Sequence, residues 1–364
     1  MFYSYKDNSI KYTGRWCEDD SCFCSTAPGS FFKIAFEGED ITLYFDTLWN
    51  REPYPHLYLS LDGGARFESP LSSFLRVETP QSGNHVLTVI FKSAVEMQHR
   101  WHSPLIAKVS FLGYEAQKNA EIFDTKEKII EFVGDSITEG VLINEEKQAD
   151  KTNGFNNRVY QDDSTATYAW LTAKNLGLTP IIMGYGAVGA TKGGCGSVPR
   201  AVEAYPYCFE SHKTNYASPD YILINHGAND RVASAEEYLK SYGELLDVIR
   251  KINPRSRLIA LSAFCGAFHK ELGEFICKYN KENSCDILFI DSSGWIPKEP
   301  LHPDRNGHKI IAERLTEILK SKLSSKQKEP KISKKVKFSA LFLPLYYHKS
   351  GKKSSLVFFA ALVY

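Results

Sequence analysis

Residues 129–138 read Ile-Ile-Glu-Phe-Val-Gly-Asp-Ser-Ile-Thr, and this stretch decides the fold. The run 129–133 is short, mostly apolar and bounded by Gly134, which is typical of a buried strand. Polar residues directly after such a strand lie at its carboxyl end, where open parallel sheets bind ligands. The stretch therefore predicts one strand of a parallel sheet, with Asp135 and Ser136 at its ligand-binding edge.

The same alternation of strand and helix continues toward the C-terminus. Short apolar runs predict strands at 129–133, 179–183, 221–225, 258–262 and 287–290. Segments of helical period predict helices at 165–175, 235–251, 271–283 and 307–323. Apolar strands that alternate with amphipathic helices predict a parallel sheet covered on both faces.

Residues 31–115 have a period of two, which is typical of strands with one buried face. Residues 31–36 and 41–45 alternate in this way around the breaker 38–40, and they predict a hairpin. Further short strands are expected at 57–61, 86–91 and 109–112. Several strands without intervening helices predict an antiparallel sandwich, with a domain boundary near 116–127.

The composition fits a folded chain, and two domains are expected because 364 residues exceed the chain length at which a single hydrophobic core usually stops growing. Residues 326–364 carry nine lysines and one glutamate, which leaves residues 1–325 with 35 basic and 42 acidic residues. An acidic body argues against a nucleic-acid partner. The apolar runs of the tail, 324–364, are too short to span a bilayer, and we expect this basic and apolar tail to be poorly ordered.

No secretory signal is recognisable at residues 1–10, so a cytoplasmic location is expected. The eight cysteines are scattered, which fits reduced thiols better than a disulfide framework. Cys17, Cys22 and Cys24 form a small cluster, but no second pair with zinc-like spacing follows. No metal site is therefore expected.

Residues suited to acyl transfer follow four of the predicted strands, namely Ser136, Gly189, Asn229 and His302. A serine becomes an effective nucleophile when a base removes its proton, and His302 is the candidate base. The N–H groups of Ser136 and Gly189 and the amide of Asn229 can stabilise an oxyanion. Ser136 taken alone fits the cap of a helix equally well, but its combination with Asn229 and His302 favours catalysis.

Over about 128–323 the chain resembles the SGNH (GDSL-type) hydrolases. The resemblance lies in four motifs and their order, namely GDSIT at 134–138, a glycine-rich turn, GAND at 227–230 and a late His-Pro. With the strand-rich front part, residues 1–325 resemble carbohydrate esterase family 2. The resemblance implies a flavodoxin-like three-layer SGNH hydrolase domain at 128–323, preceded by an antiparallel β-sandwich (jelly-roll) domain at 1–118. It also implies a serine esterase that deacetylates carbohydrates through an acyl-enzyme, without a cofactor.

One position departs from that family's pattern, in which an aspartate three residues before the histidine orients the imidazole. Here Glu299 occupies that position. Glu299 either reaches His302 or points to solvent and leaves a serine–histidine dyad. For substrate contacts, Trp295 and Tyr185 are candidates because aromatic rings stack on sugars. His226, directly before the GAND turn, is a further candidate because it can line the pocket.

Three other functions remain open at this point. Gly184, Gly186 and Gly189 match the dinucleotide fingerprint, but the glycine-rich stretch that follows is unsuited to a helix. An esterase or lipase acting on other acyl esters or thioesters is a nearer alternative. A non-catalytic sugar-binding protein is less favoured, because it has no need of serine, asparagine and histidine at separate strand ends.

Overall fold

The computed structural model describes residues 1–122, 127–144, 158–215 and 218–323. Residues 1–324 group into one compact unit that contains two main sheets. The predicted tail at 324–364 lies outside the described residues. None of the helices in the described ranges is long and apolar enough to cross a membrane.

The second part of the chain forms a five-stranded parallel sheet in the order β11-β10-β14-β15-β16. Counted along the chain, this order is 2-1-3-4-5, which is that of flavodoxin-like folds. The strands are β10 (Ile129–Gly134), β11 (Thr179–Gly184), β14 (Tyr221–Asn225), β15 (Arg257–Leu261) and β16 (Leu288–Ile290). All pairs in this sheet are parallel, so the predicted parallel sheet is confirmed.

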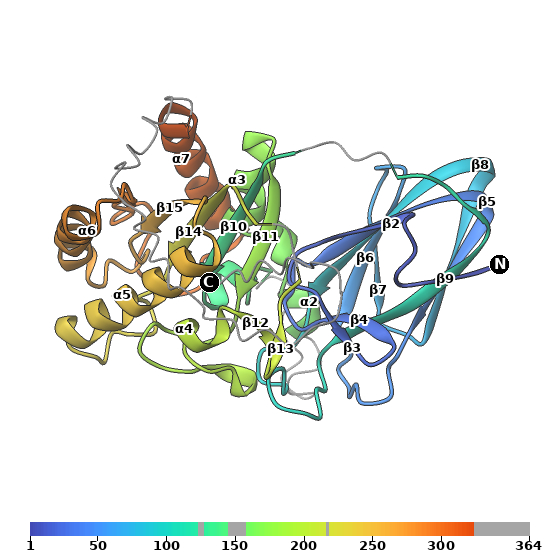
Figure 1. Ribbon diagram of the computed structural model, residues 1–364, viewed down its shortest axis with the longest axis horizontal. Coiled ribbons are helices and arrows are strands. Elements are labelled where there is room, and N and C mark those ends of the chain that lie inside the picture. The colour runs from blue at the N-terminus through green and yellow to red at the C-terminus, as the bar shows by residue number, and fades with distance from the viewer. Residues whose placement is uncertain (123–126, 145–157, 216–217, 324–364) are drawn as a thin grey trace, which may run out of the picture. The chain divides into compact units, whose positions relative to one another are not determined.

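Helices cover both faces of this sheet (Figure 1). The helices are α1 (Ser136–Glu139), α2 (Arg158–Gln161), α3 (Tyr168–Leu176), α4 (Ala201–Ala204), α5 (Ala235–Ile252), α6 (His269–Asn283) and α7 (Arg305–Leu323). On β10, Ile130 and Phe132 join the core under α3 and α7, whereas Val133 joins the core under α5 and α6. Because both faces are buried, the strands are continuously apolar rather than alternating.

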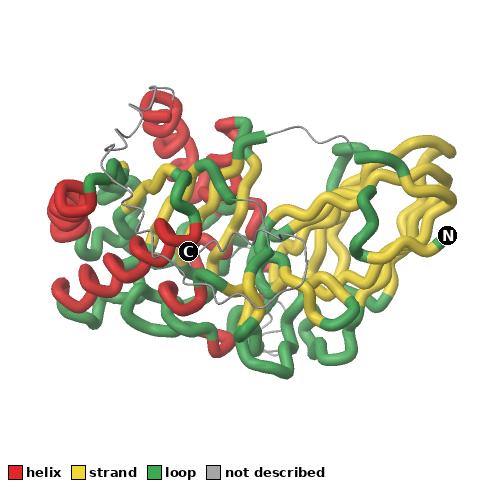
Figure 2. The backbone as a smooth tube through the Cα atoms, viewed as in Figure 1, coloured by secondary structure: helices red, strands yellow, loops and turns green. Residues whose placement is uncertain are grey.

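The first part of the chain forms a nine-stranded sheet, whose strands are the yellow segments on the right of Figure 2. The strand pairs of this sheet are antiparallel. Its strands are β1 (Phe2–Ser4), β2 (Ile10–Thr13), β3 (Cys17–Asp19), β4 (Cys22–Ser25), β5 (Phe31–Phe45), β6 (His56–Leu61), β7 (Phe67–Pro70), β8 (Phe74–Ser93) and β9 (Val109–Asn119). A separate small hairpin, not predicted, pairs β12 (Tyr207–Phe209) with β13 (His212–Lys213).

The predicted hairpin at 31–45 is wrong, because these residues form one long strand, β5. The breaker at 38–40 is instead an irregularity at which the register with β8 shifts. Gly38 has a φ of 149°, which is readily accessible to glycine, so the chain bends there without reversing. β8 pairs with most of β5, and the pairing continues both before and after this irregularity.

A buried ion pair connects the two sheets. Arg15 Nη1 lies 2.7 Å from Glu131 Oε1, and both side chains are 0% exposed. Glu131 lies on β10, the strand that precedes Ser136, while Arg15 follows β2. The front sheet is therefore fixed directly to the strand that carries the candidate nucleophile.

Candidate active site

Ser136 is the first residue of the short helix α1, directly after β10. Asp135 caps this helix, since its Oδ1 accepts a hydrogen bond from the Ile137 N–H at 2.9 Å. A side chain at Gly134 would come within 2.1 Å of Thr138 Oγ1, so the turn requires glycine. These contacts hold Ser136 at the carboxyl end of β10, an interior strand of the parallel sheet.

The structure brings His302 to Ser136. The imidazole Nε2 lies 2.8 Å from Ser136 Oγ, although the two residues are 166 positions apart. His302 is half-buried in the segment between β16 and α7. This distance is within hydrogen-bond reach, which a serine nucleophile and its general base require.

Asn229 lies after β14, on the opposite side of β10 from β11. Strands β10 and β14 flank the point where the strand order reverses, which is where such sheets bind ligands. The Asn229 Nδ2 group donates to the Val188 carbonyl at 3.1 Å and lies 3.4 Å from Asp135 Oδ2. Asn229 therefore bridges the nucleophile turn and the glycine-rich turn.

Gly189 lies in that turn, and its N–H donates to the Lys192 carbonyl at 3.0 Å. An oxyanion bound at Gly189 would have to share or replace this hydrogen bond. By contrast, the Ser136 N–H makes no hydrogen bond to another described residue. The Asn229 amide likewise already donates to Val188 and Asp135. The roles of Gly189 and Asn229 as oxyanion donors stay predictions, and the Ser136 N–H is the best placed donor.

Two buried aspartates support these turns. Burial, with a smaller contribution from Asp230, raises the pKa of Asp135 to about 7. Asp230 accepts hydrogen bonds from the Thr191 N–H at 2.8 Å and the Ala190 N–H at 3.2 Å, which fixes the turn around Gly189. A side chain at position 189 would come within 2.5 Å of Asp230 Oδ1, which explains the glycine.

Glu299 is exposed, and the structure gives its carboxylate no hydrogen bond or ion pair with another described residue. The structure therefore does not bring Glu299 to His302. It favours the arrangement in which Glu299 points to solvent and Ser136 and His302 form a dyad. A role for Glu299 in orienting the imidazole has no support here.

Two of the residues predicted to contact substrate have buried side chains. Tyr185 is 1% exposed, its hydroxyl lies 3.2 Å from Thr26 Oγ1, and burial raises its pKa to about 12. His226 is also 1% exposed, and burial lowers its pKa to about 4. Both side chains lie in the interior and cannot stack on a sugar. Trp295 is half-buried against the core under α3 and α7, so its contact with substrate stays a prediction.

His308, the other histidine near the predicted site, is not a competing base. Its side chain is fully buried, and its Nδ1 accepts a hydrogen bond from the Tyr168 N–H at 2.9 Å. Burial, with His302 nearby, lowers its pKa to about 3, so the ring is neutral. His308 therefore connects the first turn of α7 to the start of α3 as a neutral acceptor.

Sequence reasoning missed one buried ion pair next to the nucleophile. Arg100, between β8 and β9, donates from Nη2 to Glu139 Oε2 at 3.2 Å and from Nη1 to Glu139 Oε1. Glu139 is the last residue of α1, and the two side chains are 0% and 2% exposed. The pair fixes α1 to the front part of the chain. No local pattern marks it, because the partners are 39 positions apart.

A group of three metal-binding side chains does not occur among the described residues. In the cysteine cluster, Cys17 Sγ and Cys24 Sγ lie 3.8 Å apart on paired strands, and the described cysteines are free thiols.

The sequence matches no protein-family model. Among curated proteins, it is 24% identical over 243 residues to the cellulase/esterase CelE of Acetivibrio thermocellus, a match that covers 60% of this chain. The chain spans only 29% of the length of that relative.

Among solved structures, the chain is similar to a family two carbohydrate esterase from Clostridium thermocellum in complex with cellohexaose. That likeness has a TM-score of 0.68 at 21% identity and covers 86% of this chain and 99% of the other. It is also similar to an acetyl xylan esterase from the rumen bacterium Butyrivibrio proteoclasticus, with a TM-score of 0.70 at 17% identity, covering 89% and 99%. The chain thus has the fold of the family 2 carbohydrate esterases, with an antiparallel front sheet and a parallel sheet.

Proposed function

We propose that this protein is a serine esterase that removes acetyl groups from carbohydrate hydroxyls through an acyl-enzyme intermediate. The observation that carries the proposal is the 2.8 Å contact between His302 Nε2 and Ser136 Oγ at the carboxyl end of the parallel sheet. The pair lies beside the point where the strand order reverses. Fold likeness to esterases adds support, since those proteins share this two-part architecture.

In the first step His302 takes the proton of Ser136, and the serine oxygen attacks the acetyl carbonyl carbon. The carbonyl oxygen becomes an oxyanion, which the Ser136 N–H stabilises. The Asn229 amide and the Gly189 N–H add to this when they turn from their present acceptors, Val188 and Asp135 for Asn229 and Lys192 for Gly189. The tetrahedral intermediate collapses as protonated His302 gives its proton to the departing sugar oxygen. The products of this step are the free sugar hydroxyl and acetyl-Ser136.

In the second step a water molecule replaces the sugar. His302 takes a proton from the water as its oxygen attacks the acetyl carbonyl of acetyl-Ser136. The same donors stabilise the second oxyanion, and His302 returns the proton to Ser136 Oγ. Acetate leaves and the free enzyme is restored, so no group beyond those of the chain and water takes part.

The proposed substrate is an acetylated carbohydrate. One relative is named as an acetyl xylan esterase and another was determined with cellohexaose, and these names concern those proteins. Their likeness in fold supports the same class of substrate for this chain. We further propose that the front sheet is a jelly roll, and the shared two-part fold supports this finer assignment.

Acetate release from acetylated xylan and acetylated cello-oligosaccharides tests the proposal, with 4-nitrophenyl acetate as an activated ester. Ser136→Ala is the test variant, and Ser82→Ala, at an exposed serine of β8, is the matched control. We expect release from both substrate types by the wild type and the control, and none by Ser136→Ala. Release from the activated ester alone would reject the carbohydrate and indicate another acyl ester as substrate.

A further inference from the structure

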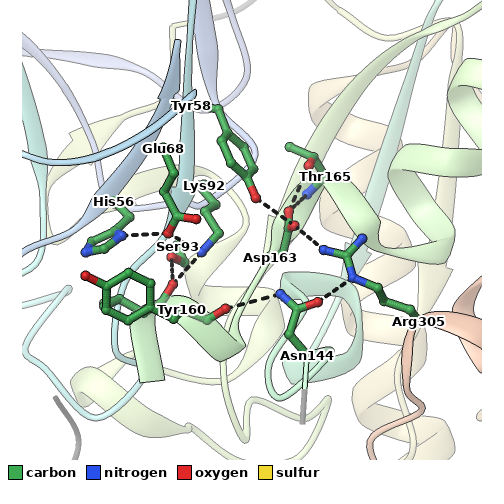
Figure 3. Close-up of polar contacts among 11 residues, drawn as sticks. His56, Tyr58, Glu68, Lys92, Ser93, Asn144, Tyr160, Asp163, Thr165 and Arg305 are labelled. Carbon is green, nitrogen blue, oxygen red and sulfur yellow. Dashed lines mark hydrogen bonds and ion pairs between the residues drawn. The ribbon is translucent and has the colours of Figure 1, made fainter. Parts of the chain in front are cut away.

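A polar cluster lies between the helix that carries Ser136 and the helix that follows His302 (Figure 3). We call its three members, Asn144, Asp163 and Arg305, the Arg305 brace. Asn144 lies eight residues after Ser136, and Arg305, the first residue of α7, lies three residues after His302. None of the three takes part in the mechanism above.

Arg305 reaches both other members of the brace. Its Nη2 donates to Asp163 Oδ2 at 2.9 Å, and its Nε donates to Asn144 Oδ1. The Asp163 side chain is 3% exposed, whereas that of Arg305 is 51% exposed. Because a guanidinium presents its donors in a fixed planar fork, two partners at once define the position of the first residue of α7.

Both partners of Arg305 are fixed relative to Ser136. The Asp163 N–H donates to the carbonyl of Gly140, the residue that follows α1, at 2.9 Å. The Asn144 N–H donates to the Gln161 carbonyl at 2.9 Å, so Asn144 is held against α2. The brace therefore connects the end of the nucleophile helix to the start of α7.

The connection from Arg305 to His302 is short and stiff. Only Pro303, which is buried, and Asp304 lie between them. Asp304 Oδ1 accepts from the Gly307 N–H at 2.7 Å and so caps α7. A shift of Arg305 is therefore transmitted to His302, whose imidazole must remain 2.8 Å from Ser136 Oγ.

The front sheet also contacts the brace. The hydroxyl of Tyr58, on β6, donates to Asp163 Oδ2 at 3.1 Å. The other carboxylate oxygen of Asp163 accepts from the Thr165 N–H and hydroxyl, at 3.0 and 2.8 Å. Three donors besides Arg305 thus orient the buried carboxylate of Asp163.

We propose that Arg305 is a positioning residue, which acts through Asn144 and Asp163 to hold His302 at hydrogen-bond distance from Ser136. Tyr58 extends this support from the front sheet. The inference rests on the proposed function in one respect, namely that Ser136 and His302 are the reacting pair. It does not depend on which ester is the natural substrate.

The experiment measures the rate at which a fluorophosphonate phosphonylates Ser136 Oγ with loss of fluoride, alongside kcat and KM for 4-nitrophenyl acetate. Arg305→Ala is the test variant, and Arg314→Ala, at an exposed arginine of α7 without a partner among the described residues, is the matched control. Since a displacement of about 1 Å costs about 100-fold in rate, we expect a loss of about 10- to 100-fold in labelling and in kcat for Arg305→Ala. KM should change little, and Arg314→Ala should behave as the wild type.

Added methylguanidinium should restore part of the labelling rate of Arg305→Ala, because the half-exposed site admits a small cation. If the alanine variant does not fold, Arg305→Lys keeps the charge but loses the fork, and an intermediate loss is expected. Labelling of the folded variants at the wild-type rate, even with a lowered Tm, would overturn the proposal, because the brace would then be only structural.

The outcomes separate this inference from the proposed function. Wild-type protein that is labelled at Ser136 but releases no acetate from acetylated sugars would reject the substrate, while the comparison of the Arg305 and Arg314 variants would still test the brace. Wild-type protein that is not labelled would reject both, since Ser136 and His302 would then not be a reactive pair.

Discussion

The buried ion pair between Arg100 and Glu139 provides a sharp test of how the front part supports the nucleophile helix. Replacing Arg100 with methionine keeps most of the side-chain volume and leaves Glu139, which is 2% exposed, without its partner. Removal of one partner of a buried pair costs about 3–5 kcal/mol. For a chain of this size the corresponding fall in Tm is roughly 6–20 °C.

The loss should depend on pH, because the pKa of Glu139 is raised by burial while Arg100 opposes that rise. Without Arg100 the pKa rises further, so the folded state holds the proton more tightly than the unfolded state. The loss of stability is then small below the ordinary pKa of 4.5 and grows as the pH rises above it. Urea unfolding followed by circular dichroism at pH 5 and pH 8 measures this difference.

Two variants control the interpretation. Arg100→Met combined with Glu139→Gln removes the uncompensated charge and should recover much of the stability at pH 8. Arg76→Met breaks an ion pair whose side chains are 58% and 40% exposed, and should cost at most about 1 kcal/mol. A loss below about 1 kcal/mol for Arg100→Met at pH 8, or a loss that does not change with pH, would refute the reasoning.

Three further predictions concern the site itself. Asn229→Ala should lower kcat by about 100- to 1,000-fold with little change in Tm, and unfolding of the variant would contradict the assigned role. Gly189→Ala places a methyl group 2.5 Å from Asp230 Oδ1, so thermal unfolding should show a loss of about 1–3 kcal/mol. Because the pKa of Asp135 is raised to about 7, its contribution to stability is lost as the pH rises from about 4 through 7. The free energy of unfolding measured with urea should therefore fall less steeply with pH over that range for Asp135→Asn than for the wild type. An equal slope for the two proteins would contradict the raised pKa.

The parallel sheet could be predicted from the sequence because its signals are local. Each strand is a short apolar run, and each long helix has its own apolar stripe, so periodicity alone locates them. The placement of Ser136 and Asn229 at one edge follows from the common direction of parallel strands. The proximity of His302 was inferred from chemistry and from the family pattern, and the structure brings it to the serine.

Other features could not be read from the sequence, for identifiable reasons. Glycine at position 38 marks an interruption, but the sequence does not show whether the chain turns back or only bends there. Position after a strand does not determine which way a side chain points, so Tyr185 and His226 were expected at the surface and are buried. The contact between Asn144 and Arg305 joins residues 161 positions apart, and no local pattern reveals such a pair.

The most direct test of the central claim is mass spectrometry of the protein quenched during turnover of 4-nitrophenyl acetate, followed by peptide mapping. The account predicts one added acetyl group on the peptide that contains Ser136, and no such group in Ser136→Ala. An acetyl group on another residue, or hydrolysis of the ester at the wild-type rate by folded Ser136→Ala, would contradict it.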